Sequence, residues 1–338
     1  MKVNKRYVAI DNVCAWPQLR INDNQEIFMT GFNQPCHGKT EGDVVLWVSK
    51  DGGETFNYTG TPVVHEPTTN RMNHCSGFAH NGDFVSIVSG YSNRPKEIIE
   101  DDEAYRQVFY QSKTLQPIIA RSSDGGVTYT NIPLQFKSDQ SIIPFGEICK
   151  LKNNALICSI YLIGDKTTKS FLGENNLSAG VLLSYDDGYT WEQYYDIDKG
   201  LNEVSISVLE DKVIAVARTA EEQHLELYQS LDWGKTWTNQ KQLSMTNQIP
   251  ASAIVLKDNR TLVTYGCRNN IKRISYRIGD QYGIRFSDPT ILQVIDTEGD
   301  MGYPSTVQLK DGSLVTGYYT SRDSHHHRYH VGIIKWTL

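Results

Sequence analysis

The octapeptide SYDDGYTW at residues 184–191 decides the fold, because its pattern S-x-D-x-G-x-T-aromatic occurs four times along the chain. The other copies begin at Ser49, Ser122 and Ser230. An Asp followed two residues later by Gly is typical of a tight turn, in which the carboxylate accepts backbone N–H groups and the Gly adopts a positive φ. Four equivalent copies indicate a repeated structural unit, so we interpret these carboxylates as turn-stabilising groups and not as a calcium site or a catalytic acid.

A second repeat has the pattern of a β-hairpin, in which an apolar strand, a short polar turn and another apolar strand follow one another. Asn, Asp and Gly tolerate the turn conformation, and the flanking Val, Ile, Leu and Tyr favour strands. The six turns are marked by Asn24, Gly82, Asn154, Lys212, Asn259 and Gly312. Six units in 338 residues leave about 56 residues each, the size of a four-stranded blade with its loop. The sequence predicts an all-β fold, a six-bladed β-propeller with four-stranded antiparallel blades, as a single domain over residues 1–338.

The composition excludes several kinds of partner. The chain carries a formal net charge of −6 and has an isoelectric point near 5.9, and no basic stripe interrupts it. We therefore expect neither a nucleic acid nor a membrane as partner. The longest apolar stretch, residues 155–163, is too short to span a bilayer. The basic N-terminal segment lacks an apolar signal region, so we expect a cytoplasmic location.

Cysteines and histidines do not indicate a metal or another cofactor. The six cysteines are spread over the chain without a C-x-x-C pair, which favours reduced, buried thiols. The one dense histidine cluster comprises residues 325–327 and His330. Because neighbouring strand residues point to opposite faces, we interpret the cluster as a polar loop, with metal binding as the alternative.

The inner strands of a propeller bring residues that are distant in the sequence to one axial mouth. Charged, polar and aromatic residues stand at or before these strands, and more lie in the loops that leave the second strands. The first group includes Trp16, Arg71, His74, Glu147, Glu203 and Tyr303, and the second group includes His37, Glu41, Arg94, Arg218 and Arg268. Such a set of donors, acceptors and aromatic rings favours a sugar-binding site.

The octapeptide repeats resemble the Asp boxes of the sialidase (neuraminidase) superfamily, whose members are six-bladed propellers. The order Glu203, Arg218, Arg268 and Tyr303 resembles the superfamily's order of base, second arginine, third arginine and nucleophile, so the resemblance spans essentially the whole chain. It implies that Tyr303 attacks the anomeric carbon and that Glu203 accepts the phenol proton. It also implies that Arg218 and Arg268 bind an anionic substituent.

These roles also make chemical sense. A phenol with a pKa near 10 needs an adjacent base to act as a nucleophile, and a guanidinium matches a carboxylate with two hydrogen bonds. The alternatives are that Glu203 serves only as an ion-pair partner of Arg218 and that Tyr303 is a packing residue.

Two positions depart from the superfamily. Sialidases carry an Arg-Ile-Pro motif in the first inner strand, where this chain has Ala-Trp-Pro at residues 15–17, so the first arginine of their triad is missing. The supporting Glu is missing as well, since the last unit has Gly-Tyr-Tyr at residues 317–319. These coupled changes indicate a rebuilt subsite in which Trp16 stacks on a sugar face. They argue against a genuine sialic-acid substrate.

The acid of sialidases is an Asp in the loop after the first strand. In the corresponding loop, residues 33–43, we interpret Asp43 as structural, which leaves His37 and Glu41 as candidates for protonating the leaving oxygen. The segment 65–74 could supply a replacement cation, Arg71, and a polar contact from His74. The alternative is a local Glu66–Arg71 salt bridge that stiffens the loop.

We expect a glycoside hydrolase that releases a terminal sugar from an oligosaccharide or glycoconjugate at the axial pocket. Retaining chemistry at Tyr303 follows from the resemblance. One alternative is a polysaccharide lyase acting on a uronic acid, with a His or Tyr as base. Another is a carbohydrate-binding propeller without catalytic activity, which the loss of the first arginine favours.

Overall fold

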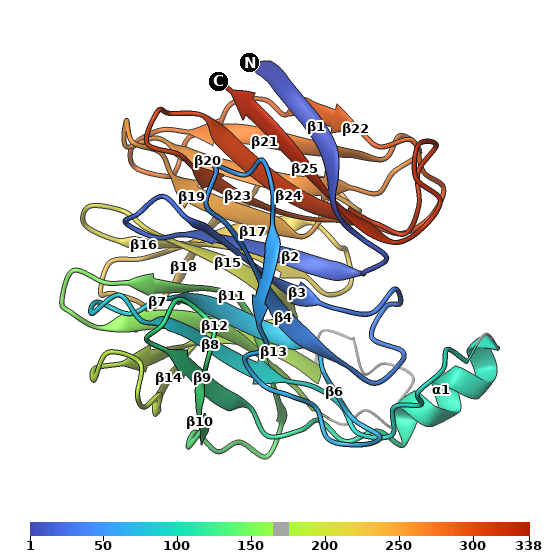
Figure 1. Ribbon diagram of the computed structural model, residues 1–338. Coiled ribbons are helices and arrows are strands. Elements are labelled where there is room, and N and C mark those ends of the chain that lie inside the picture. The colour runs from blue at the N-terminus through green and yellow to red at the C-terminus, as the bar shows by residue number, and fades with distance from the viewer. Residues whose placement is uncertain (100, 165–175) are drawn as a thin grey trace.

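The computed structural model describes residues 1–99, 101–164 and 176–338. Its strands form twisted antiparallel sheets arranged around a central axis, as Figure 1 shows. The prediction of an all-β propeller is confirmed. The sheets are built from six antiparallel runs of four strands.

The first three runs follow one another along the chain. The first consists of β2 (Ala15–Ile21), β3 (Ile27–Phe32), β4 (Gly42–Ser49) and β5 (Asn57–Gly60), with the short β6 (Asn70–Arg71) pairing in parallel with β4. The second consists of β7 (Asn73–Phe78), β8 (Phe84–Ser89), β9 (Ile118–Ser122) and β10 (Thr130–Pro133). The third consists of β11 (Ser141–Lys150), β12 (Leu156–Ile163), β13 (Leu177–Ser184) and β14 (Gln193–Lys199).

The last run joins both ends of the described chain. The fourth run consists of β15 (Leu201–Val208), β16 (Val213–Thr219), β17 (Leu225–Ser230) and β18 (Thr238–Gln242). The fifth consists of β19 (Ala251–Val255), β20 (Thr261–Cys267), β21 (Arg273–Gly279) and β22 (Thr290–Val294). The sixth consists of β23 (Met301–Gln308), β24 (Leu314–Thr320), β25 (His330–Thr337) and β1 (Lys2–Asp11). Because β1 pairs with β25, the N-terminal strand closes the ring, and the two termini lie side by side in Figure 1.

The prediction of six separate four-stranded sheets is only partly met. Hydrogen bonds divide the strands into five sheets, because the inner strands β7 and β11 pair in parallel and join the second and third runs into one sheet of eight strands. The pairing requires a very close approach, since a Cβ on Gly77 would lie 2.1 Å from the carbonyl oxygen of Ile148. Glycine at position 77 therefore permits this fusion.

The predicted hairpins and Asp boxes have the expected structures. Each inner strand pairs antiparallel with the strand that follows its turn. In the box at residues 184–191, Asp186 Oδ1 accepts hydrogen bonds from Ser184 Oγ at 2.8 Å and Thr190 N at 2.9 Å. Thr190 Oγ1 donates to Oδ2 at 2.7 Å. The other three boxes repeat this pattern, which supports the structural interpretation of their carboxylates.

The apolar core lies between neighbouring runs. Clusters of buried Val, Ile and Leu side chains connect each run to the next, and one further cluster connects the last run to the first. Trp191 and Trp336 are fully buried in this ring of clusters. Burial of this kind holds the runs at fixed angles and positions the strand ends that carry the site.

One helix within the described residues was not predicted from the sequence. α1 (Asp102–Tyr110) lies between β8 and β9 and projects from one end of the propeller in Figure 1. The side chain of Asp101 caps it by accepting a hydrogen bond from Ala104 N at 2.7 Å. No helix in the described part of the chain has the length and apolar character needed to cross a membrane.

Candidate active site

The propeller axis has a cavity at each end. The first, which we call the tyrosine pocket, has a volume of about 530 Å³ and lies at the N-terminal ends of the inner strands; its lining includes Trp16, His37, His74, Glu203 and Tyr303. The second, which we call the glutamate pocket, has a volume of about 700 Å³ and lies at the opposite ends. A narrow cavity of about 20 Å³, lined by both Tyr303 and Glu147, is found between these positions.

Tyr303 and Glu203 are in direct contact in the tyrosine pocket. The Tyr303 hydroxyl donates a hydrogen bond to Glu203 Oε1, and Arg218 Nη1 donates to Glu203 Oε2 at 2.6 Å. Burial and the negative charge of Glu203 raise the pKa of Tyr303 well above its usual value, while Arg218 and Arg268 act in the opposite direction. The structure thus brings together the predicted nucleophile and base, one hundred positions apart.

Irregularities in the inner strands aim these side chains at the pocket. Tyr303 and Trp16 both have positive φ angles, 48° and 46°, which are uncommon for aromatic residues. The strand registers shift around Trp16, Glu203 and Tyr303. The shifts lie between Ala15 and Gln18, between Leu201 and Val204, and between Gly302 and Ser305. A β-bulge redirects a side chain that regular alternation would place elsewhere.

The two retained arginines lie close to Glu203 and Tyr303. Arg218 is held by Glu203, and Arg268 Nε donates to the carbonyl oxygen of Met301 at 2.9 Å. The Arg268 guanidinium lies 5.6 Å from the centre of the Tyr303 ring. Neither arginine is among the residues that line the tyrosine pocket. Their positive charges favour a phenolate at Tyr303, and substrate binding by them stays a prediction.

Trp16 provides an aromatic wall at the place of the missing arginine. Its ring packs against Phe32 with centroids 5.8 Å apart and lies edge-on to the His37 ring at 4.8 Å. It also lies 6.4 Å from the Tyr303 ring. The wall presents an apolar surface next to the reactive hydroxyl, as the predicted stacking role requires.

His37 has a carboxylate partner that the sequence analysis missed. His37 Nδ1 lies 3.0 Å from Asp300 Oδ2, and the Tyr319 hydroxyl donates to the same oxygen at 2.5 Å. Burial alone would raise the pKa of Asp300, but His37, Arg268 and Tyr319 together hold it well below its usual value. Asp300 is therefore ionised and fixes one ring nitrogen of His37. Its position just before β23, the inner strand that contains Tyr303, is the one signal that the sequence offered.

Glu41, the other candidate acid, does not line the tyrosine pocket. Its Oε1 accepts a hydrogen bond from Thr68 N at 2.6 Å, and its Oε2 lies 3.9 Å from His65 Nε2. The carboxylate thus connects two loops. Asp43 is structural, as predicted, since its Oδ1 accepts a hydrogen bond from His65 N at 2.6 Å. The placement of Glu41 does not support its predicted role as the acid.

Arg71 also points away from the pocket, so its prediction as a substrate-binding cation is wrong. It belongs to β6, whose parallel pairing with residues 42–43 turns the side chain to Gln116, where Nη1 donates to the carbonyl oxygen at 3.2 Å. Burial lowers the pKa of Arg71. No ion pair between Arg71 and Glu66 occurs within the described residues, although the charge of Glu66 acts on the guanidinium.

His74 lines the tyrosine pocket as a neutral residue. Its Nε2 is 2.9 Å from Thr30 Oγ1. Burial lowers the pKa of His74 to about 3, so the ring is uncharged at neutral pH. His74 can offer hydrogen-bonding capacity to a ligand but no charge.

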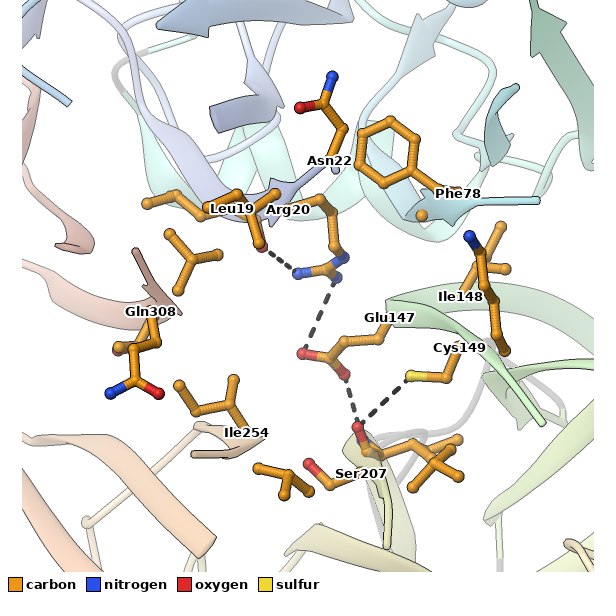
Figure 2. Close-up of a pocket in the computed structure, with 18 of the residues that line it drawn as sticks. Leu19, Arg20, Asn22, Phe78, Glu147, Ile148, Cys149, Ser207, Ile254 and Gln308 are labelled. Atoms are coloured by element: carbon orange, nitrogen blue, oxygen red, sulfur yellow. Dashed lines mark hydrogen bonds and ion pairs between the residues drawn. The ribbon is translucent and has the colours of Figure 1, made fainter. Parts of the chain in front are cut away.

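Glu147 lines the glutamate pocket and not the tyrosine pocket, a position that does not support its predicted role in substrate binding (Figure 2). Glu147 Oε1 lies 3.8 Å from Arg20 Nη2, and its carboxylate accepts hydrogen bonds from Ser205 Oγ and Ile206 N, each at 3.1 Å. Burial raises the pKa of Glu147. Glu147 lies within the register shift of β11, between Phe145 and Ile148, where regular strand alternation does not predict the direction of a side chain.

The histidine cluster makes ion pairs at the edge of the last sheet. His326 Nε2 lies 2.5 Å from Asp11 Oδ1, and His330 Nε2 lies 3.7 Å from Asp323 Oδ2. These contacts fit the interpretation as a polar loop. Among the described residues, no group of three or more His, Cys, Asp and Glu side chains is arranged to hold a metal ion.

Solved structures with the same architecture include several sialidases. A protein of unknown function from Dyadobacter fermentans superposes with a TM-score of 0.81 at 22% identity, covering 100% of this chain and 99% of that one. A Hadza microbial sialidase gives 0.72 at 16%, covering 96% and 65%, and Trypanosoma rangeli sialidase in complex with the inhibitor DANA gives 0.69 at 15%, covering 97% and 55%. The chain thus spans slightly more than half to two thirds of these two sialidases.

These likenesses establish the fold. No curated protein matches the chain. The model of the BNR repeat-like domain matches residues 104–316, more than half of the chain. The resemblance stated from the Asp boxes is confirmed: the chain belongs to the BNR repeat-like family and has the propeller fold of the sialidase superfamily.

Proposed function

We propose that the protein is a retaining glycoside hydrolase that releases a terminal sugar from an oligosaccharide or glycoconjugate in the tyrosine pocket. The observation that carries the proposal is the hydrogen bond from the Tyr303 hydroxyl to Glu203. A buried phenol in contact with a carboxylate can transfer its proton as it attacks carbon. The sialidase fold supports a carbohydrate as the ligand.

In the first step, the Tyr303 oxygen forms a bond to the anomeric carbon as its proton passes to Glu203. The bond between that carbon and the leaving oxygen breaks, and His37 protonates the leaving oxygen. Arg218 and Arg268 offset the negative charge that develops on the phenol oxygen, and they act without moving because protein groups already hold them.

In the second step, His37 removes a proton from water, which attacks the same carbon. The bond to the Tyr303 oxygen breaks, and Glu203 returns the proton to the phenolate. Asp300 is a positioning residue in both steps, since its bond to Nδ1 leaves Nε2 of His37 as the nitrogen that exchanges protons. Two displacements at one carbon retain its configuration.

The test is turnover by the wild type and by Tyr303→Phe on a panel of aryl glycosides and sulfated or uronic-acid glycans. We expect the variant to fold, since Phe keeps the ring contacts, and to lose about 10³-fold or more in kcat. Proton NMR of the initial product should show the anomer of the substrate. Undiminished turnover by Tyr303→Phe, or an inverted product, would contradict the proposal.

The same assay separates the alternatives. A lyase would yield an unsaturated product that absorbs in the ultraviolet, whereas hydrolysis yields a new reducing end without that absorption. Oligosaccharide binding without reducing-end release would replace the proposal by a carbohydrate-binding propeller.

A further inference from the structure

The tyrosine pocket contains a buried cation that the proposed mechanism does not use. Arg94 follows β8, lines the pocket and has only 1% of its surface exposed. Its guanidinium carbon lies 5.2, 5.8 and 5.6 Å from the ring centres of Tyr91, Tyr105 and Phe109. The last two rings belong to α1, so the helix forms part of the wall around the guanidinium.

Two of the three guanidinium nitrogens of Arg94 lack a partner among the described residues. They are Nε and Nη1, and both are buried. Among the side chains that the structure describes, no carboxylate forms an ion pair with Arg94, and the groups that act on its charge are Tyr105, Tyr91 and Cys36. Contact with aromatic faces offsets part of the cost of burying a cation, but it leaves the N–H donors unpaired. An unpaired buried cation lowers the stability of a fold, whereas its unpaired N–H donors can bind an anionic ligand.

The charges of the pocket lining agree with this reading. Lys39 and Arg106 also line the pocket on the α1 side. Glu203 is the single carboxylate among the described lining residues, and Arg218 and Tyr303 already bind it. Arg106 has a carboxylate neighbour, since its Nη1 lies 3.8 Å from Glu103 Oε2, whereas Arg94 has none among the described residues. A cation of this kind in a cavity attracts anions.

Aromatic side chains lie between Arg94 and Tyr303 in the pocket. Tyr161 packs with Tyr91 in one apolar cluster, and the electrostatic neighbours of its hydroxyl are Tyr91, Glu203 and Tyr303. A sugar ring that lies on these side chains with its anomeric carbon at Tyr303 directs its far substituents toward Arg94. The retained arginines do not line the pocket and are held by Glu203 and the Met301 carbonyl.

We propose that Arg94 is an anion-binding residue of the tyrosine pocket and pairs with a carboxylate or sulfate on the sugar, at a position remote from the anomeric carbon. The identification of the ligand as a sugar rests on the proposed function. Specificity for an anionic sugar is then set by Arg94 and the α1 rings that surround it, and not by Arg218 and Arg268. A guanidinium with two free N–H donors matches either oxyanion.

The test is calorimetric titration of the wild type and of Tyr303→Phe with three monosaccharides: glucuronate, glucose 6-sulfate and glucose. These sugars have no glycosidic bond to cleave, so the result does not depend on turnover. We expect at least one anionic sugar to bind about 10- to 100-fold more tightly than glucose in both proteins. The tighter of the two identifies the substituent as carboxylate or sulfate.

Arg94→Met removes the charge and keeps an apolar side chain of similar length. We expect this variant to bind all three sugars equally and to unfold at a temperature no lower than the wild type, because it removes an unpaired buried charge. Arg106→Met is the matched control, since Arg106 lines the same pocket with a side chain that is 66% exposed. We expect it to keep most of the preference.

Several results would overturn the inference. They are equal binding of the three sugars by the wild type, no binding of either anionic sugar, and a preference that persists in Arg94→Met. A large loss of stability in Arg94→Met would show instead that Arg94 serves the fold. If Tyr303→Phe retains both turnover and the anion preference, the proposed mechanism fails and the Arg94 subsite stands.

Discussion

At the scale of single residues, the proposed site depends on contacts between charged and titratable side chains. Tyr303 is buried beside Glu203, which raises the pKa of its phenol, and two guanidinium groups act against that rise. His37 is fixed by Asp300, whose carboxylate is kept ionised by its neighbours. Glu203 and Asp300 thus each hold a side chain of the proposed mechanism by a direct contact.

Asp300→Asn tests the positioning of His37. The carboxylate fixes the orientation of the imidazole, so its loss should reduce kcat by about 10- to 100-fold, with KM little changed. The conservative variant Asp300→Glu should restore part of the activity. An equal loss of kcat in Tyr319→Phe, which keeps the carboxylate, would assign the effect to packing and contradict the role of the carboxylate.

At the scale of elements, the Asp boxes show how a short motif fixes a strand-to-strand turn. In each box the Ser hydroxyl donates to the Asp carboxylate and accepts from the Gly N–H at 2.8 Å. The Trp ring at the end of a box then packs beneath, and Trp191 Nε1 donates to the Gly188 carbonyl at 3.1 Å. The motif therefore satisfies its own backbone at the end of the third strand of a run.

Asp186→Ala should lower the free energy of unfolding by about 1–3 kcal/mol, because it leaves the N–H and hydroxyl of Thr190 without their acceptor. Burial tends to raise the pKa of Asp186, but the Thr190 and Ser184 hydrogen bonds lower it below the usual 3.8. A carboxylate whose pKa is lower in the folded state stabilises above its unfolded pKa and loses that effect as the pH falls.

The difference in the free energy of unfolding between wild type and Asp186→Ala should therefore be largest at neutral pH and decrease below about pH 4. Urea unfolding at several pH values measures it. Asp139→Ala, at an exposed site outside the boxes, is the control and should leave the midpoint unchanged. Equal destabilisation by the two substitutions would contradict the proposed role of the box.

At the scale of the whole molecule, the two axial cavities are chemically separate. The tyrosine pocket holds the proposed catalytic groups, whereas Arg20 and Glu147 bridge the inner strands at the other end. Arg20 donates to the carbonyl oxygens of Ser76 at 2.7 Å and Gly146 at 2.6 Å. It also donates to the carbonyl oxygen of Leu19 at 2.6 Å, and Figure 2 shows Arg20 beside Leu19 and facing Glu147. Together with the bonds from Ser205 and Ile206 to Glu147, this pair therefore ties strands from four runs together at the centre of the ring.

Glu147→Gln tests that separation. The variant leaves Arg20 buried with a weaker partner, so the free energy of unfolding should fall by about 1–3 kcal/mol, while kcat and KM stay within about twofold of the wild type. Chemical unfolding and steady-state kinetics on the same preparation give both values. A large rise in KM without loss of stability would restore Glu147 as a substrate-binding residue.

The sequence was sufficient for the fold because its information is local and repeated. Turn residues and Asp boxes recur with the period of the unit, so the propeller followed from counting. The Glu203 and Tyr303 pair followed from family order. The sheet fusion at Gly77 did not, because it depends on how closely two distant strands approach.

The site was harder to predict because the direction of a side chain depends on strand register. Glu147 lies within the register shift of β11, where alternation does not predict the direction of its side chain, and β6 pairing turns Arg71 outward. Asp300 was missed because its partners come from distant loops and strands. The buried state of Arg94 depends on α1, which lacks the long apolar period that marks a helix in a sequence.

The pairing of β1 with β25 has a consequence for the order of assembly. Lys2 is matched to Thr337, so β1 is synthesised long before β25, the strand with which it pairs. Until residues 330–337 have left the ribosome, the nascent polypeptide presents two unprotected sheet margins that are open to mispairing. A partly synthesised chain should therefore depend on chaperones, and the pairing of β1 with β25 should form late in folding.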